Sequence, residues 1–483
     1  MERLHGLDAA FLALETATMH LHVGAVLVFD PDPDAVEGGD EGPGLRYERL
    51  RSLVEERLHL VPALRRRVVR VPFGLHHPVW VDDPGFDLDD HVRRASLPRP
   101  GGPTELAGFV ADVAGRALAE RSPLWELHLV EGLESGHVAL VPKVHHALFD
   151  GVSGLEVIAS FLDAGPVPRA VEEPGRAWRA ETVPTDVELV GSAVSSLLRQ
   201  PERAIDALRR TAGAVRDLSE RNRRLREEDD VLPPPAPFRA PRTSLNGAIS
   251  PHRRFAFAQA PLEELRAVRR IFGGTVNDVV LAAVAGALRR LLAARGEELD
   301  DPLVALVPMS VRGDASSGDV GNRISAMLVS LATCIADPVE RLTTIAAGTR
   351  LAKEQARVLS EDLVRGWAQL AFPALSTRLA RLAGNLRLFD HVPPVFNVLV
   401  SNVVGPSFPL WCAGARMVAL YPLGPIIEGV GLNVTVASYE GTLYVGILGC
   451  RDLVPEVDRF ADHLSEAFGE LAKAAVRHGG HWA

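Results

Sequence analysis

The chain has 483 residues, 47% of them hydrophobic, which is enough for two cores in a large enzyme. Its formal net charge of -10 at pH 7 argues against a nucleic-acid partner. The cysteines Cys334, Cys412 and Cys450 have no CxxC spacing. The sequence therefore predicts no disulfide framework and a reducing, cytoplasmic location.

Two segments of the sequence bear on membrane attachment. Residues 1–25 contain acidic residues and histidines but no basic segment followed by an apolar run, so they do not resemble a secretory signal. The apolar stretch 417–437 is interrupted by Pro422, Pro425 and Glu428, which favours a buried strand pair or loop over a membrane span. We therefore expect any contact with the inner membrane or with lipid inclusions to be peripheral.

The predicted elements divide the chain into three parts. Residues 1–168 form a first domain, 169–242 a bridge that ends in a proline-rich stretch, and 243–483 a second domain. In chain order, the apolar patterns predict strands at 23–29 and 125–131 with a helix near 104–119 between them, then a helix at 277–294 and strands at 303–307, 324–331, 396–404 and 443–447.

The sequence His145-His146-Ala147-Leu148-Phe149-Asp150-Gly151 has the pattern HHxxxDG. A strand-like run at 137–144 precedes it, and helical spacing at 152–162 follows. An imidazole at such a junction can take a proton from a hydroxyl near neutral pH. The alternatives are metal binding or packing, with Asp-Gly as a turn, but no HExxH motif or second His/Asp cluster lies nearby, so we expect no metal.

Pro142 lies in the strand that leads to these histidines. Proline has no N–H to donate to a sheet ladder. The sequence therefore predicts a bulge or an edge position for this strand.

The bridge contains apolar residues at helical spacing over 187–225, interleaved with arginines. One interpretation is a basic amphipathic helix that lies in a membrane interface. The other is a helical crossover packed against the two domains with a solvated outer face. The acidic run 227–230 weakens the electrostatic argument for the membrane, and both interpretations stay open.

Several further segments, with the histidine motif, resemble one family in their order along nearly the whole chain. They are Leu7 to Glu15 followed by Met19-His20, Pro123-Leu124-Trp125, Asn277-Asp278, Val307 to Arg312, Gly321 to Ile324, and Ser401 to Pro406. Together they resemble the bacterial wax ester synthase/diacylglycerol acyltransferases of the CoA-dependent acyltransferase superfamily. The resemblance implies an α/β (α+β) fold with two chloramphenicol-acetyltransferase-like sandwich domains joined by a long helical crossover.

The resemblance also implies an activity and roles for the motif. A long-chain acyl group would pass from acyl-CoA, a co-substrate rather than a cofactor, to diacylglycerol or a long-chain alcohol. His146 matches the general base, and no covalent acyl-enzyme is required. His145 would support the hydrogen-bond network. Asp150, beside Gly151, would either orient His146 or form a structural ion pair, for which Arg312 is the candidate partner; we favour the ion pair.

Two asparagines are candidates to stabilise the oxyanion that forms during attack, namely Asn277 and Asn402. Each has an alternative role. Asn277-Asp278 has the composition of a helix N-cap, and Asn402 precedes the turn-forming Gly405 and Pro406. Trp125 and Phe149 are more typical of core residues than of a wall along an acyl chain.

Two other functions fit the sequence. One is a condensation-type or polyketide-associated acyltransferase that takes its acyl group from a carrier protein. The other is a lipid-binding protein without catalysis. The matches at both ends of the chain favour the lipid acyltransferases, and the intact HHxxxDG motif argues against loss of catalysis.

Overall fold

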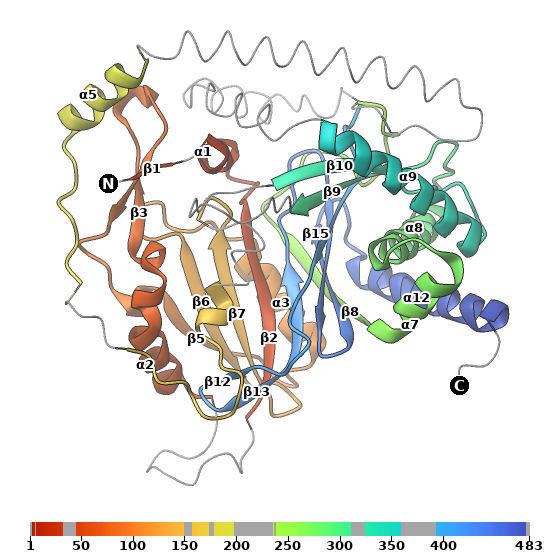
Figure 1. Ribbon diagram of the computed structural model, residues 1–483, viewed down its shortest axis with the longest axis horizontal. Helices are drawn as coiled ribbons and strands as arrows, with labels where there is room; N and C mark the ends of the chain where they lie inside the picture. Colours follow the sequence, from red (N-terminus) through yellow and green to blue (C-terminus); the bar gives the residue numbers. More distant parts are fainter. Residues whose placement is uncertain are drawn as a thin grey trace.

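The computed structural model describes residues 2–4, 6–31, 45–148, 157–172, 178–197, 235, 238–310, 324–358 and 393–479. Two six-stranded sheets form the body of this part of the molecule (Figure 1). Each sheet is mixed, and helices cover the outer side of the second one.

The first sheet has the strand order β12-β13-β2-β7-β6-β5. All its neighbouring strands are antiparallel except β5 and β6. Its strands are β2 (His22–Asp30), β5 (Val92–Ser96), β6 (Trp125–Glu131), β7 (Val138–His145), β12 (Trp411–Cys412) and β13 (Ala415–Leu423). A smaller sheet beside it contains β1 (Glu2–Arg3), β3 (Arg66–Val69) and β4 (Val79–Asp82).

The second sheet has the order β10-β9-β11-β14-β15-β8, with β11 parallel to both of its neighbours. Its strands are β8 (Arg253–Pro261), β9 (Val304–Ser310), β10 (Ile324–Ser330), β11 (Val398–Val403), β14 (Leu432–Tyr439) and β15 (Thr442–Cys450). The strand predictions for both sheets are confirmed, with small shifts at the ends.

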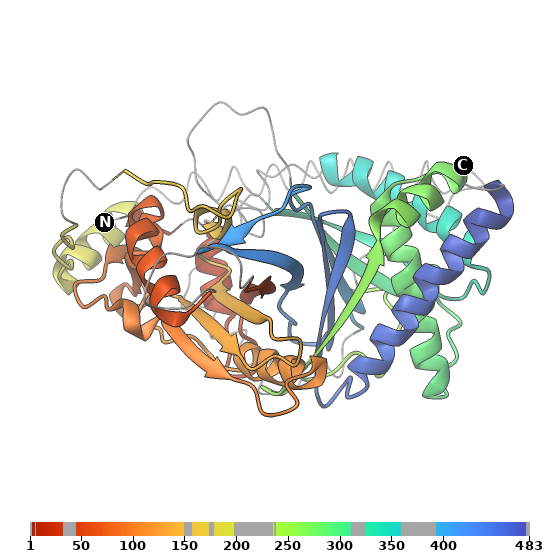
Figure 2. The same ribbon diagram turned by 90° about the horizontal axis from the view of Figure 1, so that it is seen from below.

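A layer of four helices covers the side of the second sheet that faces away from the first (Figure 2). The helices are α7 (Leu262–Phe272), α8 (Val276–Ala294), α9 (Pro338–Val358) and α12 (Val457–Gly479). The middle of α8 is buried on all sides, from Val279 to Leu288, as its uniformly apolar sequence requires.

The remaining helices belong to the first half of the chain. They are α1 (Gly6–Leu14), α2 (Tyr47–Arg57), α3 (Pro103–Ala114) and α5 (Asp186–Leu197), with short 3-10 turns at Leu58–Leu60, Pro62–Arg65, Pro72–Gly74 and Leu88–Asp90. α3 ends at Ala114, earlier than the predicted residue 119, because Gly115 caps it and its N–H bonds to the Ala111 carbonyl.

One apolar cluster joins the two sheets. Val110 of α3 and Val26 and Val141 of the first sheet pack in the same apolar cluster as Phe255 and Leu448 of the second. The apolar stretch 417–437 supplies β13 to the first sheet and β14 to the second, so its two strands are not paired with each other. The domain boundaries at residues 168 and 243 remain our proposal. β12 and β13 come from the second of the predicted domains but belong to the first sheet.

The prediction for Pro142 is wrong, because β7 is an interior strand and its register is unbroken. β7 pairs with β2 from His22 opposite His145 to Phe29 opposite Val138, and the ladder skips only the residues around Pro142. Gly24 makes this possible, since a Cβ at that position would lie 2.2 Å from the Pro142 carbonyl oxygen. A side chain is absent where the strands approach most closely.

The described part of the predicted bridge helix packs against the first half of the chain. Leu189 and Ala193 of α5 are buried against Val71, Val79 and Val81, although Val187 is exposed. Arg3 donates a hydrogen bond to Ser192 Oγ at 2.6 Å, which ties α5 to β1. Most of the arginine-rich segment lies outside the described residues.

No individual helix in the described ranges is both long and apolar enough to cross a membrane. α7 and α8 together meet that length and composition only as a pair bent by 99°. α8 is packed inside the protein, as described above.

Candidate active site

The two histidines of the motif stand where β7 ends. The His145 N–H donates to the Leu124 carbonyl at 3.0 Å, and the His146 N–H donates to the Leu21 carbonyl at 2.8 Å. Leu124 precedes β6 and Leu21 precedes β2, so both neighbouring strands hold the backbone of the pair. The Pro-Leu-Trp motif thus positions His145 through a main-chain carbonyl.

His145 is fully buried, and a hydrogen bond holds one of its ring nitrogens. Nδ1 accepts a hydrogen bond from the Ala147 N–H at 3.0 Å. In the neutral ring the proton therefore resides on Nε2, which faces Glu15 Oε2 at 3.6 Å. The hydrogen bond at Nδ1 orients the ring, and its complete burial leaves it no path to solvent.

Glu15 is the centre of a cluster of three histidines. Its Oε1 lies 3.7 Å from both His20 Nδ1 and His22 Nε2, while Oε2 faces His145. Burial by itself raises the pKa of the Glu15 carboxyl, but the interactions with His145, His20 and His22 outweigh it and hold the pKa well below 4.5. The carboxylate is therefore ionised at neutral pH.

His22 is the neutral member of this cluster. Burial lowers its pKa well below 6.5, and the neighbouring His145 and Lys143 lower it further. Its ring lies edge-on to His145 with centroids 5.7 Å apart and stacks on His20 at 5.4 Å. The cluster is thus a packed network around one negative charge.

His146 has different surroundings. It follows the last residue of β7, is only half-buried, and stacks on the ring of Phe11 in α1 with centroids 4.5 Å apart. The stacking restricts the orientation of the imidazole while part of the ring stays accessible. Of the two histidines, His146 is the one that a substrate can reach.

Asn277 and Asn402 meet at the start of α8. Asn402 Nδ2, from β11, donates to Asn277 Oδ1 at 3.3 Å. The helix cap is made by other residues, because Thr275 and Asp278 form a reciprocal capping box. Asp278 Oδ1 also accepts from Thr349 Oγ1 at 2.6 Å, which fastens α9. Asp278 is therefore structural, while Asn277 bonds across to β11.

Trp125 is a core residue. Its ring is 5% exposed and stacks on His91 at 4.5 Å, and its Nε1 donates to the Leu64 carbonyl at 2.7 Å. Pro123 and Leu124 beside it are buried as well.

Other predicted residues lie outside the described part of the chain, namely Phe149, Asp150, Gly151 and Arg312. A different buried ion pair is present nearby. Arg57 Nη2, at the end of α2, donates to the two carboxylate oxygens of Asp163 at 2.8 and 3.0 Å, with both side chains 2% exposed.

Metal and thiol chemistry find no support in the described residues. No group of three or more His, Cys, Asp or Glu side chains among them is arranged to hold a metal ion. All three cysteines are unpaired. Burial raises the pKa of Cys412 to about 12 and that of Cys334 above 9.0, so neither is a nucleophilic thiolate at neutral pH.

Sequence reasoning missed the roles of Glu15, His20 and His22. Glu15 and His20 belong to the segment that resembles the family's N-terminus, and His22 follows it directly. A single sequence does not show that this segment folds against the end of β7. The alternation of His20 and His22 with Leu21 was the available signal, because residues two apart share a face of an extended strand.

Comparison with solved structures defines the class of fold. The chain aligns over 96% of its length with a trichothecene 15-O-acetyltransferase from Fusarium sporotrichioides, covering 94% of that chain, at a TM-score of 0.56 and 12% identity. It aligns with the starter condensation domain of rhizomide synthetase at a TM-score of 0.53 and 14% identity, covering 99% and 95% of the two chains. The protein has the mixed α/β two-domain fold of condensation domains and chloramphenicol-acetyltransferase-like acyltransferases.

Closer relatives define the family. Residues 4–280 match the wax ester synthase/diacylglycerol acyltransferase catalytic domain, and residues 320–472 match the WS/DGAT C-terminal domain. The chain is 36% identical over 477 residues to the Mycobacterium tuberculosis protein named "Putative diacyglycerol O-acyltransferase Rv1760", covering 98% of this chain and 91% of the relative.

A solved structure of this kind covers the whole molecule. The wax ester synthase/diacylglycerol acyltransferase from Marinobacter aquaeolei VT8 is 29% identical, with a TM-score of 0.67, 98% of this chain covered and 100% of that one. The chain belongs to the wax ester synthase/diacylglycerol acyltransferase family.

Proposed function

We propose that the protein transfers a long-chain acyl group from acyl-CoA to the hydroxyl of diacylglycerol or a long-chain alcohol, with His146 as the general base. The observation that carries this proposal is the difference between the two histidines. His145 is fully buried, with Nδ1 hydrogen-bonded and Nε2 facing Glu15, whereas His146 is only partly buried and stacks on Phe11. Relatives named for diacylglycerol acyltransfer supply the substrate class.

The proposed reaction moves one proton and replaces the carbon–sulfur bond of the thioester with a carbon–oxygen bond. His146 takes the proton of the acceptor hydroxyl as the oxygen attacks the thioester carbonyl. The tetrahedral intermediate collapses, the carbon–sulfur bond breaks, and the imidazolium returns the proton to the departing thiolate. The products are an ester and free CoA, so no cofactor is needed. The buried, protonated thiol of Cys412 is consistent with direct transfer.

We assign the oxyanion to the asparagine pair of the second half. Asn402 Nδ2 uses one hydrogen for Asn277 Oδ1, and its second hydrogen makes no bond to another described residue. An amide donor held in one orientation suits a charge that develops only during attack. Asn277 acts by positioning Asn402.

The test measures CoA release by the purified full-length chain from palmitoyl-CoA, with hexadecanol, with a diacylglycerol and without an acceptor. We expect acceptor-dependent release that His146→Ala reduces by about 10²–10⁴-fold, the usual contribution of a general base. The ratio of the two acceptors ranks wax ester against triacylglycerol synthesis.

A matched control is His137→Ala, since His137 adjoins the opposite end of the same strand, about 30 Å from His146 at ~3.3 Å per residue. It should leave turnover unchanged. If folded His146→Ala turns over at the wild-type rate, His146 is not the general base. Release only from an acylated carrier protein favours the condensation-type alternative, and lipid binding without turnover favours the non-catalytic one.

A further inference from the structure

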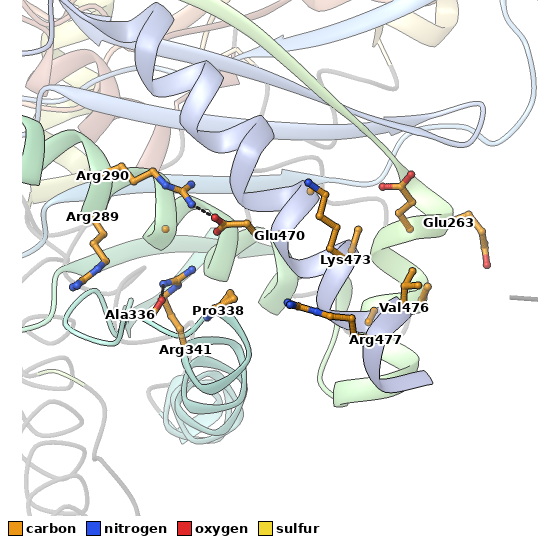
Figure 3. Close-up of a pocket in the computed structure, with 16 residues that line it drawn as sticks. Glu263, Arg289, Arg290, Ala336, Pro338, Arg341, Glu470, Lys473, Val476 and Arg477 are labelled. Carbon is orange, nitrogen blue, oxygen red and sulfur yellow. Dashed lines mark hydrogen bonds and ion pairs between the residues drawn. The ribbon is translucent and has the colours of Figure 1, made fainter. Parts of the chain in front are cut away.

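A cavity of about 1090 Å³ lies in the helical layer of the second half, outside the site described above (Figure 3). α7, α8, α9 and α12 surround it. Its apolar lining includes Ala267, Ala472, Ala475 and Val476.

Positive charge dominates the polar lining. Five cationic side chains line the cavity against three carboxylates, and these are Arg289, Arg290, Arg341, Lys473 and Arg477 against Glu263, Glu264 and Glu470. The carboxylates are largely engaged. Glu470 pairs with Arg290, and Glu263 pairs with Arg266 and Arg270. The described part of the chain offers Lys473 and Arg477 no ion-pair partner.

Arg341 is the strongest indication of a ligand. Its side chain is 2% exposed, yet its hydrogen bonds to described residues go only to neutral carbonyls, those of Ala282, Ile335 and Ala336 at 3.0–3.3 Å. Its Nη2 lies beside Gly286, where a Cβ would approach it to 2.9 Å. Glu470 and Asp337 attract Arg341 at a distance, without a direct ion pair, and the neighbouring Arg289 and Arg290 oppose that attraction. A buried guanidinium that no carboxylate contacts directly is costly, and a bound anion would offset the cost.

Arg289 adds a second unneutralised charge beside it. Its Nη1 donates to the carbonyls of Thr333 and Cys334 at 3.0 and 3.3 Å, so it too is satisfied by neutral groups. Figure 3 shows Arg289, Arg290 and Arg341 gathered at one end of the cavity, with Lys473 and Arg477 farther along α12. The cavity therefore offers a cationic end continuous with an apolar wall.

We propose that this cavity binds a phosphate monoester, with the phosphate against Arg289 and Arg341 and the apolar part of the ligand along the alanines of α12. Arginine guanidinium groups match phosphate oxygens in geometry and remain charged when buried. The monoester belongs either to a lipid headgroup or to a free metabolite. The site lies on the helical layer and does not depend on the proposed acyl transfer.

The experiment uses the full-length chain and two probes without acyl substrate. Inorganic phosphate is titrated calorimetrically, and flotation measures binding to phosphatidylcholine vesicles with and without phosphatidic acid. We expect saturable binding to at least one phosphate probe. Arg289→Gln removes a proposed contact to the phosphate and should weaken binding about tenfold or more, the usual loss for a charge-assisted contact. Lys473→Glu/Arg477→Glu reverses two charges farther along the cavity and should weaken binding by a smaller factor, through the electrostatic potential of the cavity.

The matched control is Arg254→Glu/Arg459→Glu, an equal charge reversal at two exposed residues that do not line the cavity. It should bind as the wild type does. Binding to phosphate in solution identifies a free ester, and binding only to vesicles with phosphatidic acid identifies a lipid headgroup. Equal losses in the control, or no binding of either probe by the wild type, would overturn the proposal.

Discussion

His145 and His146 are neighbours in sequence, yet the fold gives them separate tasks. β7 ends at His145, whose ring enters a buried network around Glu15, while His146 turns toward Phe11 and remains accessible. The carbonyls of Leu21 and Leu124 hold both backbones, so the two environments are fixed relative to each other. In the mechanism that we propose, His145 supports the site and His146 transfers the proton.

We propose that Glu15 is a positioning residue, because it contacts His145, the neighbour of the proposed base His146. We expect Glu15→Gln to lower kcat about tenfold or more with little change in KM, since the substrate sites are untouched. The loss should be accompanied by a shift in the acidic limb of the kcat–pH profile. A purely structural role would change stability and leave the pH profile of the remaining activity unaltered.

The same substitution tests stability. The pKa of Glu15 is depressed in the folded protein, so its contribution is fully present above the unfolded pKa of 4.5 and disappears as pH falls toward the folded pKa. In urea unfolding at neutral pH we expect Glu15→Gln to cost about 1–3 kcal/mol. The difference in the free energy of unfolding between variant and wild type should become smaller below pH 4.5. A difference that does not change with pH would contradict a stabilising role for the ionised Glu15 carboxylate.

For Asn402 we expect a kinetic effect. Asn402→Asp keeps the shape but replaces the donor with oxygen, and loss of an oxyanion donor typically lowers kcat by about 10²–10³-fold. Turnover of palmitoyl-CoA with hexadecanol, compared with the thermal midpoint, checks this. A matched change in the same strand, Ser401→Ala, should retain activity; equal losses in both variants would point to disruption of β11 instead.

At the level of single residues, the sequence was informative where chemistry and local spacing coincide. Asn277, Asn402 and the histidine pair were found from motifs, and the structure joins the two asparagines directly. Thr275 was missed as the helix cap although Asp278 three residues later completes the capping box. The Glu15 network required a contact between residues 130 positions apart, which no local pattern contains.

Among the elements, α2 is attached to the chain that follows the histidine motif by one buried ion pair. Arg57 and Asp163 are each 2% exposed at the side chain, and the Asp163 carboxylate also accepts from the Arg169 N–H at 3.1 Å. Removing one partner of such a pair leaves a buried charge without compensation. This contact fixes the residues beyond the motif onto the first sheet.

Arg57→Met should therefore lower the free energy of unfolding by about 3–5 kcal/mol, measured by urea denaturation at neutral pH. The control is Arg51→Met on the same helix, where an exposed arginine pairs with Asp89 and Glu55. That change should have little measurable effect. If both variants have the same free energy of unfolding, the Arg57–Asp163 pair does not stabilise the attachment of α2.

Element types were largely predictable because apolar periodicity determines them, as for the strand at 125–131 and the helix at 277–294. Pro142 was the failure. Its residue type favours edges and bulges, but Gly24 on the adjoining strand lets β7 keep an interior place. The deciding residue lies more than a hundred positions away, where a sequence window does not reach.

For the whole molecule, the main feature is the exchange of strands between the two halves. β13, from the last fifth of the chain, pairs along β2 from Gly24 to Asp30 and carries β12 with it. Without them, β2 would be an open edge of the first sheet. The first sheet is thus completed by residues that composition and motif order assign to the other half.

A fragment of residues 1–242 should consequently fail to fold as a monomer, since β2 would expose unpaired backbone groups and half of an apolar core. Size-exclusion chromatography and far-ultraviolet circular dichroism of this fragment check the expectation. Co-expression with residues 243–483 should recover a soluble complex. A monomeric 1–242 fragment with cooperative unfolding would contradict the dependence.

The position of β13 in the chain also delays completion of the first sheet during translation. A ribosome that has completed β7 must add almost three hundred residues before Leu423 emerges, which takes roughly 15–60 s at about 5–20 residues per second. During that interval the strand bearing the His22 network has no partner on one side. We therefore expect chaperones that shield open strand edges to bind the nascent chain during this interval. Slower translation of the residues between β7 and β13 would lengthen the exposure of β2.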